Sequence, residues 1–100
     1  MKELKLIRKN ITANATEHFE FDVNGFEYLV VNNNEFDIYV AFKNTNNTDE
    51  MLIVPAQSSR ICLINKNANL GDTSKELFTS KDVYVYAENS GEVEVQCLMF

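Results

Sequence analysis

The sequence predicts an all-β protein, a jelly-roll-like β-sandwich of about eight antiparallel strands in one domain, residues 1–100. Apolar and polar residues alternate along several short stretches, as in strands buried on one side. Turn-forming residues separate those stretches, and no long stretch has a convincing helical pattern. A single long connection late in the chain suits a jelly roll, in which two Greek keys pack as two sheets.

The chain begins with an imperfect strand that carries Leu4, Leu6, Ile7 and Ile11. Its alternation changes phase between Leu6 and Ile7, which predicts a bulge or bend there. Leu4, Ile7 and Ile11 also have helical spacing, so a helix is the alternative. We favour the strand because no N-cap precedes so early a start and residues 10–16 are poor helix formers.

Next, Thr16–Val23 and Phe26–Val31 flank Asn24-Gly25, and this pattern predicts a β-hairpin. Its type I′ turn needs φ > 0 at both central residues, which Asn and Gly tolerate best. The predicted register also sets Asp22 against Glu27, an unfavourable like-charge pair. On the buried face it places the pairs Val23–Phe26, Phe21–Tyr28 and Phe19–Val30.

The middle of the chain predicts further short strands. They are Asp37–Phe42, with Ile38, Val40 and Phe42 on one face, then Met51–Val54 and Arg60–Asn65. The polar segment Lys43–Glu50 reads as a loop. Lys66–Ser80 is the longest irregular segment, and Thr73–Glu76 fits a capping box before one helical turn.

Two strands close the sequence. Val83–Ala87 alternates β-branched and Tyr residues, and Glu88–Gly91 reads as a four-residue hairpin loop. The last strand is the clearest amphipathic one, and its predicted inner face is Val93, Val95, Cys97 and Met99.

Composition supports a folded, acidic domain. An apolar fraction of 45% is enough for a core. A formal charge of −6 argues against nucleic acid and against anionic membranes as partners. No run approaches the roughly 20 apolar residues of a membrane span, and the first residues are unlike a signal peptide. We therefore expect the chain to stay in a cytoplasm or to be assembled from one.

No residue pattern predicts catalysis, a metal site or a cofactor. Cys62 and Cys97 are isolated, which favours two buried thiols, although a bridge between them stays open. His18 is the single histidine and lies on a charged strand face, so we interpret it as solvated and not as a general base. The oxygen-rich loop residues Asp49 and Glu50 lack EF-hand spacing, and a solvated loop is the preferred interpretation over calcium binding.

Two sets of side chains are candidates for binding. Tyr84 and Tyr86 share a strand face and make a candidate sugar-stacking platform, with ordinary cross-strand packing as the alternative. Strand alternation points Leu98 and Phe100 away from the predicted inner face. These two form a candidate subunit interface unless the segment 66–80 covers them.

Three segments in order, Val31–Val40, Leu52–Arg60 and Val83–Val95, resemble small β-sandwich virion proteins of tailed bacteriophages. The likeness is to the capsid decoration or auxiliary type and covers about Phe26–Val95. It implies a non-enzymatic structural protein of the virion, assembled in the host cytoplasm. Its partners would be capsid or other virion proteins, or further copies of the chain. The alternative is a carbohydrate-binding or receptor-binding module of a phage tail.

Overall fold

The computed structural model describes residues 5–63 and 79–100, and these residues form eight β-strands and one short 3₁₀ helix, η1 (Thr48–Glu50). The strands are β1 (Lys5–Ile11), β2 (Ala15–Gly25), β3 (Glu27–Asn32), β4 (Ile38–Ala41), β5 (Leu52–Val54), β6 (Ser58–Leu63), β7 (Ser80–Ala87) and β8 (Gly91–Met99).

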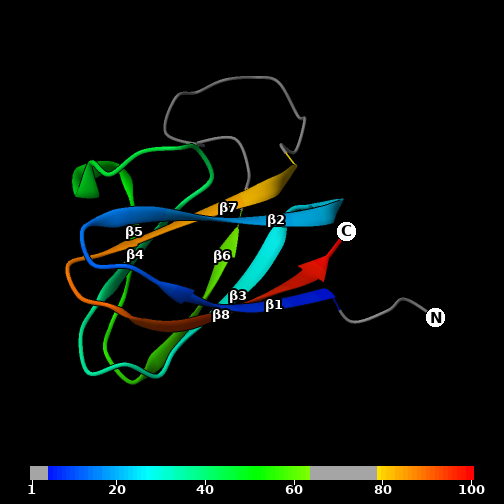
Figure 1. Ribbon diagram of the computed structural model, residues 1–100. Helices are drawn as coiled ribbons and strands as arrows, with labels where there is room; N and C mark the ends of the chain where they lie inside the picture. The colour runs from blue at the N-terminus through cyan, green and yellow to red at the C-terminus, as the bar shows by residue number, and fades with distance from the viewer. Residues whose placement is uncertain (1–4, 64–78) are drawn as a thin grey trace.

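The described strands form two antiparallel sheets of four strands each, which confirms the predicted all-β sandwich. Sheet A has the order β1-β8-β3-β6, and sheet B has the order β2-β7-β4-β5. In Figure 1, β1 and β8 lie side by side below β2 and β7, so the two layers face each other. Between consecutive described strands, only the β4–β5 connection stays within one sheet.

The core fills the space between the sheets. Alternate residues of each strand point inward, so the predicted inner faces of β4 and β7 are confirmed by the burial of Ile38, Val40, Val83 and Val85. The largest of the fully buried side chains are Tyr28 and Phe19, one from each sheet. The sequence pattern of period two is therefore a reliable guide to the core.

The predicted hairpin at Asn24-Gly25 is wrong. β2 pairs with β7 in sheet B, and β3 pairs with β6 and β8 in sheet A, so the dipeptide carries the chain between sheets. Neither residue adopts the left-handed backbone conformation that a type I′ turn requires. Phe21 and Tyr28 still touch, with ring centroids 5.2 Å apart, but they do so across the core. The expected Asp22–Glu27 pair is also absent, and Asp22 accepts from Lys5 Nζ at 3.2 Å.

Glycine is required at position 25 for close approach. A Cβ there would collide with Cys97 Sγ and would lie 2.8 Å from the Tyr28 hydroxyl oxygen. One residue later, Phe26 N–H donates to Met99 O at 3.0 Å and joins the chain to sheet A. The crossing therefore passes through a space in which only a residue without a side chain fits.

The end of β8 departs from the predicted alternation. Tyr28 pairs with Cys97 but Glu27 pairs with Met99, so Leu98 is an extra residue in the ladder. Beyond this bulge the two faces exchange: Met99 is 44% exposed, while Phe100 packs against the core. The predictions that Met99 faces inward and Phe100 outward are therefore wrong.

At the start of the chain, the predicted strand is confirmed and the predicted bulge is not. β1 pairs with β8 without a break from Lys5–Cys97 to Ile11–Gly91. Leu4, Asn65 and the helical turn predicted after Thr73–Glu76 lie outside the described residues.

The two cysteines lie on either side of Tyr28. Tyr28 pairs with Cys62 on β6 and with Cys97 on β8, so two strand spacings, about 10 Å, separate the thiol-bearing backbones. A disulfide needs Cα atoms within roughly 7 Å, and neither residue is in one. Burial raises the pKa of Cys62 to about 11, which keeps its thiol protonated and unreactive at neutral pH.

We predict that Gly25→Ala destabilises the protein by about 1–3 kcal/mol, because the new methyl group overpacks the crossing. Asn24→Ala is the matched control, since the exposed Asn24 makes no turn with φ > 0. Urea unfolding followed by circular dichroism measures both changes. Equal losses of unfolding free energy in the two variants would contradict this account and would indicate a turn that depends on both residues.

We also predict that both thiols resist a disulfide reagent at pH 8 in the folded protein and react in guanidinium. The raised pKa of Cys62 means that its contribution to stability is present below the unfolded pKa of about 8.5 and is lost as pH rises toward 11. Thiol titration by absorbance checks the reactivity. Rapid labelling of the native protein would show that the thiols are not protected by burial. A native mass two hydrogens below that of the reduced chain would show a disulfide. Either result would overturn the assignment of two buried, unpaired thiols.

Candidate functional site

The outer face of sheet A carries rows of apolar side chains. One row runs across all four strands as Leu6, Gln96, Leu29 and Ile61. The next row holds Met99, Glu27 and Leu63. We call the surface made by these rows, together with the neighbouring Val31, the apolar face; its apolar members are Leu6, Leu29, Val31, Ile61, Leu63 and Met99.

The apolar face is exposed. Leu6 is 37% exposed, Met99 44%, and Ile61 and Leu63 54% each. Among the described residues, five large hydrophobic side chains are exposed, and only Ile53 belongs to the other sheet. Single exposed apolar residues are ordinary, whereas a contiguous group marks an interaction site.

A polar border limits the apolar face on one side. Arg8 Nη2 donates to Glu94 Oε1 at 2.7 Å, and Gln96 Nε2 donates to Glu94 Oε2 at 2.7 Å. These hydrogen bonds lower the pKa of Glu94, and the same pair raises the pKa of Arg8. A shallow polar hollow of about 190 Å³ adjoins the border. The charges at this border compensate each other.

The structure places the two candidate interface residues, Leu98 and Phe100, differently from the predicted outward orientation. Leu98 is half-buried at the bulge, and Phe100 packs on the core. Met99, which the sequence assigned to the core, lies on the apolar face. The sequence analysis did not select Ile61 and Leu63 as surface candidates. The run Ile61, Cys62 and Leu63 puts apolar residues on both faces of one strand, and this pattern is the signal from which an exposed apolar face could have been predicted.

Sheet B carries aromatic rings on its outer face. Tyr84 and Tyr86 share this face as predicted, while Val83, Val85 and Ala87 are buried. His18 stacks on Tyr84 with ring centroids 4.6 Å apart and planes 8° from parallel. Tyr39 packs against Tyr86 at 6.5 Å. We call His18, Tyr39, Tyr84 and Tyr86 the aromatic strip.

The aromatic strip is held tightly and partly covered. The three tyrosines are half-buried, and Ala41, beside Tyr84, is only 6% exposed. Thr16 Oγ1 donates to Thr45 O at 3.2 Å, which brings the β4–β5 loop onto this face. His18 Nε2 lies 2.8 Å from Asp82 Oδ1, so His18 is a packed, hydrogen-bonded residue and not simply a solvated one.

The polar groups of the oxygen-rich loop, residues 43–50, bond with one another. Asn47 Oδ1 accepts from Asp49 N–H at 3.1 Å and caps η1, while Glu50 pairs with Lys43 at 3.4 Å. Within residues 5–63 and 79–100, no three His, Cys, Asp or Glu side chains gather closely enough to hold a metal ion.

A cation from sheet A bridges the two sheets at each lateral edge of the sandwich. On one side, Lys9 Nζ of β1 donates to His18 O of β2 at 2.6 Å and pairs with Glu17 at 3.1 Å. On the other, Arg60 Nη1 of β6 donates to Ile53 O of β5 at 2.9 Å. Inward-pointing charges on edge strands oppose the addition of a further strand.

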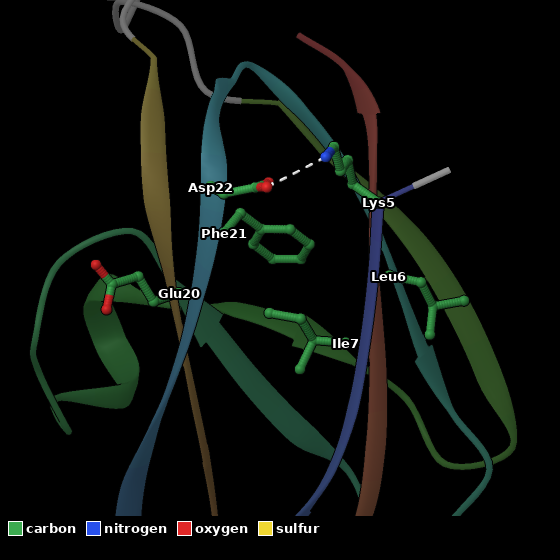
Figure 2. Close-up of a pocket in the computed structure, with 6 residues that line it drawn as sticks. All are labelled: Lys5, Leu6, Ile7, Glu20, Phe21 and Asp22. Atoms are coloured by element: carbon green, nitrogen blue, oxygen red, sulfur yellow. Dashed lines mark hydrogen bonds and ion pairs between the residues drawn. The ribbon is translucent and has the colours of Figure 1, made fainter. Parts of the chain in front are cut away.

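A small cleft opens between edge strands β1 and β2. Figure 2 shows Ile7 and Phe21 pointing toward each other inside it, with Leu6 and Glu20 pointing away. The Lys5–Asp22 ion pair, at 3.2 Å, spans its mouth. The cleft holds about 310 Å³, and the 4% exposure of Phe21 shows that its floor belongs to the core.

No helix of the described residues is long and apolar enough to cross a membrane. No protein-family model, no curated protein and no solved structure matches this chain. The surfaces described above are therefore the basis for a functional argument.

Proposed function

We propose that this protein is a non-enzymatic structural protein of a phage virion, of the capsid decoration or auxiliary type, assembled in the host cytoplasm. It works by protein–protein contacts through the apolar face. The observation that carries this proposal is the exposure of Leu6, Ile61, Leu63 and Met99 on one side of one sheet. Apolar surface of this kind loses water favourably when a protein partner covers it.

The strand pairing supports the virion assignment. β1 pairs with β8, β2 with β7, β3 with β6 and β4 with β5, as in a long two-stranded ribbon folded over on itself. That pairing is the one expected of a jelly roll, an architecture used by viral capsid domains and by lectins. Fold alone does not assign function, so this likeness supports the proposal only together with the surface.

The cation bridges at the two lateral edges support contact through a face of the sandwich. Lys9 and Arg60 each engage a backbone carbonyl of the opposing edge strand. A partner that added a strand at either edge would have to displace a charged hydrogen bond. Docking on the apolar face disturbs none of these interactions.

We predict that the purified protein co-sediments with assembled capsids of the phage that encodes it, and that Ile61→Lys reduces the bound fraction about tenfold or more. A buried lysine in the contact loses hydration without gaining a partner. Ile53→Lys is the matched control, because Ile53 is 44% exposed on the other sheet. If the wild-type protein does not co-sediment with capsids, the virion assignment is wrong.

The aromatic strip favours a second candidate, a carbohydrate-binding or receptor-binding module of a phage tail. Sugar rings stack on aromatic faces, and Asp82 and Asn14 place polar oxygens beside His18 and Tyr86. For this candidate we predict glycan-array binding that Tyr86→Ala abolishes, with Tyr84→Ala weakening it and Ile61→Lys leaving it unchanged. An array without hits, or binding that survives both tyrosine changes, would eliminate it.

A further inference from the structure

We infer that the partner covering the apolar face is a second copy of this chain, packed sheet A against sheet A about a two-fold axis. The inference rests on the proposed function, since it names what occupies the same surface while the protein is not bound to a capsid. Three properties of the apolar face support it: the way its rows overlie each other, its charge and its area.

The rows match under a two-fold rotation. Sheet A has β1 and β6 at its edges and β8 and β3 in the middle. An axis parallel to the strands, between β8 and β3, sets β1 of one copy over β6 of the other and leaves each row opposite itself. Leu6 of one copy then faces Ile61 of the other, and Glu27 faces Met99. The strand directions of two packed sheets differ by roughly 30°, so the rows overlie each other only approximately.

The charge of the apolar face is compatible with this pairing of two acidic copies. The chain carries a formal charge of −6. The three rows that contain Ile61, Leu63 and Val31 hold Arg8, Glu94 and Glu27, which sum to +1 − 1 − 1 = −1. Under the two-fold rotation Arg8 faces Ser59 and Glu94 faces Val31, so no two like charges oppose each other. Two acidic copies therefore meet at the apolar face with little of their net charge opposed.

The area suits a weak dimer. Four strands about 4.8 Å apart and about six residues long, at roughly 3.3 Å per residue, give a projected area near 400 Å² per copy. Side-chain relief brings the total buried by two copies to roughly 1,000 Å², the lower limit for a specific interface. We therefore expect a dissociation constant in the micromolar range, with monomers dominant in dilute solution.

Sedimentation velocity from about 1 µM to 1 mM tests the inference, with a rising weight-average mass expected for the wild type. Ile61→Lys should raise the dissociation constant about tenfold or more, whereas Ile53→Lys should leave it unchanged. A wild type that stays monomeric to 1 mM would overturn the inference. Equal effects of the two substitutions would overturn it as well.

An NMR measurement on the unaltered chain removes any dependence on variant folding. In a mixture of isotope-labelled and unlabelled protein, intermolecular contacts should join the Leu6 methyls of one copy to the Ile61 methyls of the other. Intermolecular contacts confined to the edge strands β2 and β5 would contradict the proposed packing.

The capsid and self-association experiments distinguish a failure of the proposed function from a failure of the proposed dimer. Dimers of the predicted arrangement without capsid binding would support this inference and remove the virion assignment. Capsid binding by a strict monomer would support the proposed function and remove the second copy as the partner.

Discussion

Burial of two apolar sheet surfaces against each other is the interaction on which the rest of this protein depends. Consecutive described strands, except β4 and β5, lie in different sheets, so no neighbouring pair such as β2 and β3 forms a ladder by itself. Apart from β4 and β5, the strands that pair within each sheet are not consecutive in the sequence, and packing between the sheets holds them together. Phe21 against Tyr28 is one contact of this kind, and a close crossing at Gly25 permits it.

The same burial fixes which surfaces remain for function. Once Val83, Val85, Val93 and Val95 fill the interior, alternation leaves the intervening residues outside. On sheet B these are aromatic rings that pack on one another beneath part of the β4–β5 loop. On sheet A they are aliphatic side chains that remain exposed. The outer face of sheet B is therefore aromatic and partly covered, whereas that of sheet A is aliphatic and open to a partner.

Much of the architecture was predictable because strand alternation is a local signal. Val83–Ala87 and Ile38–Val40 could be assigned to the core from period two alone. Asn24-Gly25 misled the prediction because the dipeptide favours a hairpin turn, whereas here a distant cysteine and tyrosine dictate the glycine. The exchange of Met99 and Phe100 follows from a bulge at Leu98 that only pairing with Glu27 and Tyr28 reveals.

The candidate surface was predictable only in part for a related reason. A patch is a property of registers between strands, and Leu6, Leu29 and Ile61 come from three separate regions of the chain. The sequence indicates that each of these residues belongs to a strand, but it does not indicate which strands are neighbours. Hydrogen bonds from a side chain of one sheet to a carbonyl of the other, such as Arg60 to Ile53 O, cannot be read from the sequence for the same reason.

The central position of β8 has a consequence for biosynthesis. β8 occupies the gap between β1 and β3, and both of those strands leave the ribosome well before it does. Until β8 is available, sheet A consists of two unconnected parts, and a nascent chain cannot complete either its ladders or its interior. Sheet A can therefore be completed only after β8 has been synthesised, when insertion of this one strand joins the two parts.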